Sequence, residues 1–189
     1  RPCITASVPR MSETPTLLID VGINPDTKPD VLYQYAVLGS LYAKHVYNIN
    51  EPRVGLLNIG EEEEKGNLQT KAAFSAMKGT KDFNFTGNIE ANELFGDKVD
   101  VIVCDGFVGN VMLKEAEAFY TLIRKRNIRD EFFEKFNFVN YGGTPIMGIN
   151  APVLIGHGIS NETAIKNMIL HTADVVYAKL VDKIKEAFK

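Results

Sequence analysis

Three stretches of the sequence combine residue types that could bind and activate a small anion. Residues 58–67 contain Asn58, Gly60, Lys65 and Asn67; residues 105–114 contain Asp105, Gly106, Gly109, Asn110 and Lys114; residues 157–161 contain His157, Gly158, Ser160 and Asn161. Lysine supplies a point charge, glycine lets the backbone approach a ligand, and asparagine can donate or accept hydrogen bonds. The sequence therefore predicts a concave site for a small anion such as phosphate, with Lys65, Lys114 and His157 as cationic members.

A purely structural explanation stays open for each stretch. The two glycines of the second stretch are also what an ordinary strand-to-helix turn needs for close packing. Lys65-Gly66-Asn67 also fits a solvated loop, and the four glutamates before it are favoured near a helix start by the helix dipole. Ser160 or Asn161 also suits the cap of the following helix. Residue types alone leave ligand binding and these structural roles equally open.

Each stretch follows an apolar run typical of a strand and precedes a helical pattern. The strands are expected at residues 53–59, 101–105 and 151–155. In open α/β sheets, ligands bind outside the carboxyl ends of the strands, where helix N-termini offer N–H groups to anions. We therefore expect these strand ends, together with residues 20–24, to face one shared cleft.

The remaining residues supply the elements of an α/β fold. Further strands are expected at residues 4–8, 17–22 and 82–86, and further helices after a cap at Asp26 or Thr27, from about residue 67 to 78, at 90–95 and at 129–138. Helix 107–126 is expected to turn Val111, Phe119, Leu122 and Ile123 inward, and one final helix, 162–188, to turn Ile165, Met168, Thr172, Val176, Leu180 and Ile184 inward. Residues 140–150 are expected to form a shaped loop that leads to a short strand. This alternation predicts a mostly parallel sheet with helices on both faces.

Composition restricts the class of protein. The 189 residues are 45% hydrophobic and 24% charged with a net charge of −3, which gives no support for nucleic acid as a partner. Cys3 and Cys104 lie in apolar runs, where thiols serve as core filler, as in proteins of a reducing cytoplasm. The sequence has no metal-binding cysteine spacing, no nucleotide-binding glycine motif and no Gly-x-Ser-x-Gly elbow for a serine nucleophile. No apolar run approaches the roughly eighteen residues of a membrane span.

Six linked motifs, in order along essentially the whole chain, resemble the phosphate acyltransferase family of bacterial phospholipid synthesis. They are DVGIN (20–24), AVLGSLYA (36–43), LLNIGEEEEKGN (56–67), CDGFVGNVMLK (104–114), NYGGTPIMGIN (140–150) and GHGISNETAIKN (156–167). The resemblance implies a fold like that of isopropylmalate dehydrogenase and phosphotransacetylase, without nicotinamide or another cofactor. It also implies conversion of acyl-[acyl carrier protein] and inorganic phosphate to acyl phosphate and free carrier protein.

That reaction suits the candidate residues. Phosphate is already anionic at pH 7, and a thiol with a pKa near about 8.5 can leave as thiolate, so no covalent nucleophile is required. We expect Lys65 and glycine-loop N–H groups to hold phosphate, and His157 or Asn110 to donate to the oxyanion of the tetrahedral intermediate. Asp105 is expected to orient Lys65 or the loop.

The resemblance also carries expectations about the extent of the chain and its partners. The family's N-terminal portion is absent, so residues 1–189 are expected to be a single α/β unit from the C-terminal part of a larger two-lobed enzyme. Residues 114–140 are expected to form a protruding helical hairpin, shorter than in many relatives. Its phenylalanines and basic residues suit a membrane surface, and suit core or dimer contacts as well. The family implies a cytoplasmic homodimer, with peripheral membrane contact and hand-off of product to a membrane acyltransferase.

Two other functions stay open. A phosphate acetyl- or butyryltransferase would use coenzyme A thioesters on the same architecture. A noncatalytic fragment would instead dock the carrier protein or a second subunit.

Overall fold

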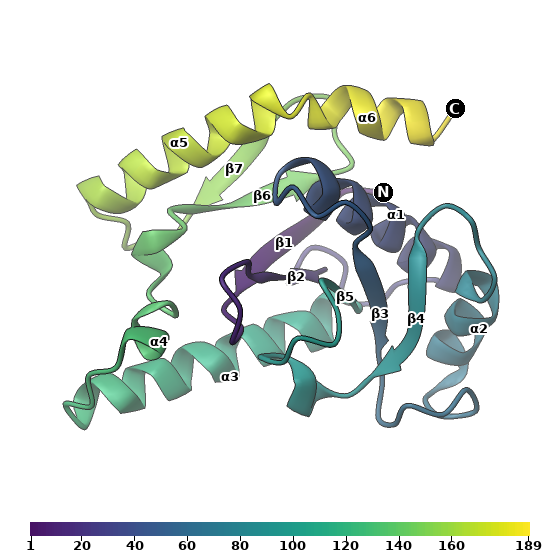
Figure 1. Ribbon diagram of the computed structural model, residues 1–189, viewed down its shortest axis with the longest axis horizontal. Coiled ribbons are helices and arrows are strands. Elements are labelled where there is room, and N and C mark those ends of the chain that lie inside the picture. The colour runs from purple at the N-terminus through teal and green to yellow at the C-terminus, as the bar shows by residue number, and fades with distance from the viewer.

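The computed structural model describes residues 1–189 and arranges seven strands in one mixed sheet (Figure 1). The strands are β1 (Cys3–Val8), β2 (Thr16–Ile19), β3 (Arg53–Leu57), β4 (Asn84–Ile89), β5 (Val101–Val103), β6 (Gly143–Met147) and β7 (Val153–Gly156). Their order across the sheet is β4-β3-β5-β2-β1-β6-β7. Strands β4, β3, β5 and β2 pair in parallel, whereas β1 is antiparallel to β2 and β6, and β7 is antiparallel to β6.

Helices cover both faces of this sheet (Figure 1). Helices α1 (Pro29–His45), α2 (Leu68–Met77), α5 (Glu162–Tyr177) and α6 (Leu180–Ala187) contribute side chains to one hydrophobic cluster. Helix α3 (Gly106–Lys125) and the 3-10 turn η1 (Ala91–Glu93) lie at the other face. The short helix α4 (Glu131–Glu134) and the 3-10 turn η2 (Phe138–Asn140) connect α3 to β6. The predicted α/β class is therefore confirmed, with the parallel pairing concentrated in β4, β3, β5 and β2.

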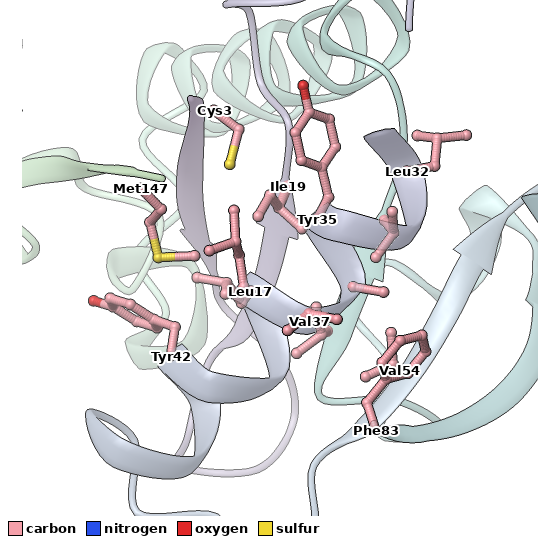
Figure 2. Close-up of a cluster of buried hydrophobic side chains, with 14 of the residues drawn as sticks. Cys3, Leu17, Ile19, Leu32, Tyr35, Val37, Tyr42, Val54, Phe83 and Met147 are labelled. Atoms are coloured by element: carbon pink, nitrogen blue, oxygen red, sulfur yellow. The ribbon is translucent and has the colours of Figure 1, made fainter. Parts of the chain in front are cut away.

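Alternating side chains of the central strands form the core on the two faces. Leu17 and Ile19 of β2 pack under α1, whereas Leu18 between them faces the α3 side. Figure 2 shows the α1 face, where Tyr35 and Tyr42 of α1 belong to the same buried cluster as Cys3 and Met147. Both cysteines are buried, as expected, and burial raises the pKa of each thiol. They are core filler and carry no nucleophilic thiolate at pH 7.

Helix α1 forms as its sequence pattern predicts, except at its cap. The predicted inward residues Val31, Tyr35, Leu38 and Tyr42 are all buried. Pro29 occupies the first turn, where its missing N–H costs nothing. The N-cap, however, is Lys28 with no side-chain hydrogen bond, because the Thr27 hydroxyl accepts a hydrogen bond from Gln69 of α2.

Helix α3 turns a different face inward from the one predicted. Val111, Phe119 and Leu122 are 50%, 59% and 54% exposed, whereas Ala116 is buried. Gly106 and Gly109 bring its first turn against the loop after β2, and the half-buried Met112 and Leu113 pack against the cluster on this face of the sheet. Three of the four predicted inward residues therefore form a surface stripe, and the fourth, Ile123, is half-buried.

The final helix is two helices, and the predicted loop 140–150 contains a strand. Lys179 adopts a left-handed conformation (φ 51°) that ends α5 and starts α6. Leu180 and Ile184 are buried as predicted, but Ile165 and Val176 are exposed and Val175 is buried instead. Residues 143–147 form β6 because they pair with both β1 and β7. No helix is long and apolar enough to cross a membrane.

Candidate active site

Three loops meet at one edge of the sheet, where β3, β5 and β2 end side by side. The Asn110 side-chain amide donates to the Val21 carbonyl at 3.1 Å, and the Gly106 N–H donates to the Asn24 carbonyl at 2.8 Å. The loop after β2 and the turn before α3 are therefore fastened together. This confirms that the ends of these three strands share an edge.

Asp20 organises the loop after β2 and was not singled out from the sequence. Its carboxylate is fully buried and accepts hydrogen bonds from the N–H groups of Ile4, Gly22, Ile23 and Asn24 at 2.8 to 3.3 Å. The Asn24 side chain also donates to it. The available signal was an acidic residue directly after the apolar run Leu17–Ile19, since a buried carboxylate needs several donors.

Three of the first four N–H groups of α3 already have partners, in contrast to the expectation that this helix N-terminus would receive an anion. The Asp105 side chain is the N-cap and accepts from Val108 N–H at 2.8 Å. The Gly106 N–H is bonded to Asn24, and the Gly109 N–H to the Asp105 carbonyl. An acidic cap also repels phosphate. The Asp105 carboxylate is bonded to its own helix and not to Lys65, so its expected role in orienting Lys65 or the loop stays a prediction.

Both glycines of this turn are required by packing. A Cβ on Gly109 would fall on the Asp20 carbonyl oxygen, and a Cβ on Gly106 would lie 2.9 Å from the Asn24 carbonyl oxygen. The packing explanation of these glycines is therefore confirmed, while substrate binding by them stays a prediction. Asn110 holds the Val21 carbonyl and is partly buried at the same edge.

The loop between β3 and α2 leaves more of its polar groups free. Asn58 donates to the Lys65 carbonyl and the Asn88 side chain, both at 3.1 Å, and Asn67 caps α2 by accepting from Thr70 N–H. Lys65 is exposed and forms no ion pair, although the aliphatic part of its side chain packs over Gly60. The backbone N–H groups of Leu68 and Gln69 have no partner within the chain. A cation and two open donors therefore lie at the N-terminus of α2.

His157 lies at the opposite edge of the sheet, so the expected convergence with Lys65 is wrong. The reason is strand direction: β7 runs antiparallel to β6, and Gly156 pairs with Gly143 at the start of β6. The His157 ring lies against Phe138, with ring centroids 4.8 Å apart, and its Nδ1 accepts from Ile159 N–H. Ser160 donates to the His157 carbonyl, and Asn161 is the N-cap of α5.

A pocket of about 250 Å³ lies between α3 and the sheet and contains two of the predicted residues. Lys114 lines it but is paired with Glu117 at 2.8 Å, and His157 lines it at the other side. Most of the wall is apolar, including Ile4, Ala6 and Val8 of β1. Tyr141 also lines the pocket, and burial raises its pKa to about 12, so its hydroxyl stays protonated.

The polar groups of the three-loop edge differ from those of the pocket. Cys3 and Cys104 are both buried near Asp20, and the Cys104 Sγ lies 3.5 Å from the Asp20 carbonyl oxygen. No group of three or more His, Cys, Asp or Glu side chains is arranged to hold a metal ion. What the three-loop edge offers is a lysine, backbone N–H groups and asparagine amides.

Two solved structures share the fold. A branched-chain phosphotransacylase from Enterococcus faecalis superimposes with a TM-score of 0.63 over 93% of this chain and 65% of its own, at 14% identity. A phosphotransacetylase from Staphylococcus aureus superimposes with a TM-score of 0.58 over 95% of this chain and 54% of its own, at 16% identity. At such identities the likeness establishes the fold alone, which is the one expected from the sequence.

Sequence comparison shows the family. Proteins named phosphate acyltransferase match this chain at 41% identity in Wolinella succinogenes and 43% in Halothermothrix orenii, over 100% and 98% of this chain. The chain spans only 62% and 61% of their lengths. The family described as fatty acid synthesis protein matches residues 1–132. The chain therefore belongs to the fatty acid synthesis protein family, whose matching relatives carry the name phosphate acyltransferase.

Proposed function

We propose that this chain is the part of a phosphate acyltransferase that binds phosphate and the reacting thioester carbonyl. The enzyme would convert acyl-[acyl carrier protein] and inorganic phosphate to acyl phosphate and free carrier protein. The observation that carries the proposal is the match over the whole chain to relatives of that name. The three-loop edge supports it, because Lys65 lies there beside two N–H groups without partners.

The proposed reaction needs positioning more than activation. A phosphate oxygen attacks the thioester carbon, forming a C–O bond and a tetrahedral oxyanion. The C–S bond then breaks and the carrier leaves as thiolate, which takes a proton from water. Lys65 and the first N–H groups of α2 would hold phosphate, with Asn58 and Asn67 fixing the loop.

Asn110 is the better candidate for the oxyanion donor. Its side-chain amide lies at the three-loop edge, whereas His157 lies at the opposite edge. An amide N–H can donate to Val21 in the free protein and to the oxyanion in the transition state. Asp105 would position Asn110 by capping the first turn of α3.

The test is hydroxylamine trapping of acyl phosphate with matched lysine variants. Lys65→Ala is expected to raise the KM for phosphate at least about tenfold, since a charge-assisted contact contributes roughly 1.5 kcal/mol or more. Lys71→Ala removes another exposed lysine of the same helix region and serves as control. Asn110→Ala is expected to lower kcat roughly 100-fold. An unchanged phosphate KM in Lys65→Ala would remove that lysine from the site.

The acyl donor separates this proposal from its rivals. Comparing turnover of decanoyl-[acyl carrier protein] with decanoyl-coenzyme A distinguishes the carrier-protein enzyme from a coenzyme A phosphotransacylase. Carrier-protein binding by this chain without acyl phosphate formation, under conditions in which a full-length relative is active, would favour the noncatalytic docking fragment.

Assembly and location are part of the same proposal. We propose a homodimer in the cytoplasm that contacts the membrane surface and hands acyl phosphate to a membrane acyltransferase. The exposed apolar stripe of α3, formed by Phe107, Val111, Phe119 and Leu122, supports such a contact. Sedimentation would detect the dimer, and co-flotation with anionic lipid vesicles would detect the membrane contact; Phe119→Ser is expected to weaken whichever contact uses the stripe.

A further inference from the structure

The pocket beneath α3 runs along the sheet from the three-loop edge toward the opposite edge. Ile4, Ala6 and Val8 line its floor, and these alternate residues of β1 share one face of the sheet. At about 3.3 Å per residue, the distance from Ile4 to Val8 is roughly 13 Å. The pocket is therefore long enough for an extended chain and not only for a compact group.

One end of the pocket adjoins the groups assigned to the reaction. Val21 lines the pocket there, and its carbonyl is the one that accepts a hydrogen bond from Asn110. The Ile4 N–H is bonded to the Asp20 carboxylate at the same end. A substrate whose carbonyl lies at Asn110 could thus place the rest of its acyl group along β1.

Phe138 and His157 line the other end of the pocket, and their rings are in contact. The two charged side chains that line the pocket, Lys114 and Glu117, form an ion pair with each other. The Ser7 hydroxyl is bonded to the Tyr47 hydroxyl at 2.6 Å. The Tyr141 and Thr144 hydroxyls also line the pocket and are uncharged. The chemistry of the pocket fits a hydrocarbon chain.

We propose that this pocket holds the acyl chain of the donor, with the thioester carbonyl at Asn110 and the terminal methyl group near Phe138 and His157. This rests on the proposed function, because an acyl donor is its substrate. His157 then limits chain length at the far end of the pocket, which leaves Asn110 as the oxyanion donor.

Two alanines of α3 provide a matched test. Ala116 lines the pocket and is buried, whereas Ala118 lies on the exposed side of the same helix. Ala116→Phe fills the pocket, and Ala118→Phe adds the same ring outside it. Binding is measured by displacement of a fluorescent fatty acid with decanoate or butanoate as competitor, at matched fractions of folded protein.

Ala116→Phe is expected to weaken decanoate binding at least about tenfold, because each buried methylene group contributes roughly fourfold. Butanoate binding is expected to change little, and Ala118→Phe is expected to bind both like the parent chain. Equal decanoate binding in the parent and in Ala116→Phe would overturn the proposal. If Ala116→Phe does not fold, Ala6→Leu fills the same space from β1 and is read in the same way.

Phe138→Ala tests the far end of the pocket. Removing the ring is expected to shift the preference from decanoate toward palmitate, and an unchanged preference counts against the assignment of this end. The binding measurement needs no phosphate, so it can succeed when hydroxylamine trapping finds no acyl phosphate. Conversely, acyl phosphate formation with the same chain-length profile in Ala116→Phe would overturn the pocket assignment and leave the proposed function standing.

Discussion

The sheet has a parallel half (β4, β3, β5 and β2) and an antiparallel half (β1, β6 and β7), and the central parallel strands β3 and β5 enclose their side chains far more completely than the antiparallel edge strand β7. Val54, Leu56 and Val101 in the parallel half are fully buried. Val153 and Ile155 of β7 are 38% and 45% exposed. Strands buried on both faces fix the loops at their ends, whereas an edge strand with one uncovered face leaves its loop freer. This explains why the three-loop edge is fastened by many hydrogen bonds and the His157 loop by few.

The largest expected effect comes from breaking the buried ion network at the start of the parallel strands. Asp100 is 3% exposed and bonds Arg10 and Arg53, each at 2.9 to 3.0 Å. Asp100→Ala leaves the Arg10 guanidinium buried without this partner and is expected to lower the free energy of unfolding by about 3 to 5 kcal/mol in urea titrations.

The same network has a pH signature. Burial alone would raise the pKa of Asp100, but hydrogen bonds from Arg53 and Arg10 outweigh burial and lower it. Stability from this carboxylate is therefore present above its ordinary pKa of about 3.9 and lost as the pH falls below that value. The Asp100→Ala variant is expected to lose less stability than the parent chain over that acid range. Equal acid slopes would contradict the assignment.

The second effect compares one glycine from each half. Gly109→Ala forces a methyl group onto the Asp20 carbonyl and is expected to cost about 1 to 3 kcal/mol of unfolding free energy. At Gly158 no atom lies within 4 Å of the added methyl group, so Gly158→Ala is expected to stay within about 0.5 kcal/mol of the parent chain. Similar losses at both positions would show that the His157 loop is as tightly packed as the three-loop edge.

A third and smaller effect asks whether the halves also differ in local capping. Asn67 caps α2 through Thr70 N–H, and Asn161 caps α5 through Ala164 N–H. Alanine at either position is expected to cost about 1 kcal/mol in thermal or urea unfolding. Equal losses of unfolding free energy at the two caps would mean that the halves differ only in tertiary packing. A loss at only one cap would mean that they also differ in the stability of their helix ends.

The smallest expected effect is a pH dependence of the contact between α5 and α1. His171 is bonded to the Tyr42 hydroxyl, and burial lowers the pKa of His171 despite the opposing charge of Asp174. Because the folded-state pKa lies below the ordinary value of about 6.5, stability is lost as the pH falls below that value. His171→Gln is expected to flatten unfolding free energy against pH in this range. Some slope remains from His45, whose pKa is lowered by burial and by nearby lysines.

The sequence predicted the elements that depend on local pattern. The strand, polar turn and helix around Asp105 form as expected, and the inward face of α1 follows its apolar period. The direction of β7 in the sheet was not predicted, because an apolar run looks the same for a parallel and an antiparallel strand. His157 was therefore expected at the wrong edge of the sheet. The inward face of α3 was wrong because apolar residues also form surface stripes.

The role of Asp20 could not be predicted because its donors come from distant and local segments together. Ile4 lies sixteen residues earlier and reaches Asp20 only after β1 pairs with β2. No glycine or proline in the sequence indicates the break at Lys179. The left-handed conformation of this residue is stabilised by burial of Leu180 and Ile184 after it. The role of Asp20 and the break at Lys179 both depend on contacts between distant segments, which the local pattern of a single sequence does not reveal.

The left-handed residue Lys179 changes the direction of the chain between α5 and α6, so that α6 packs back against the core. A straight helix over residues 162–187 would be roughly 40 Å long. The bend at Lys179 instead lets Leu180 and Ile184 join the cluster around Tyr42. Helix α1 in turn packs on β5 through Gly39, at whose position a Cβ would lie 2.5 Å from Val101. Proteolytic trimming ahead of residue 180 would therefore loosen α1 and, through β5, the distant turn that carries Asp105 and Asn110.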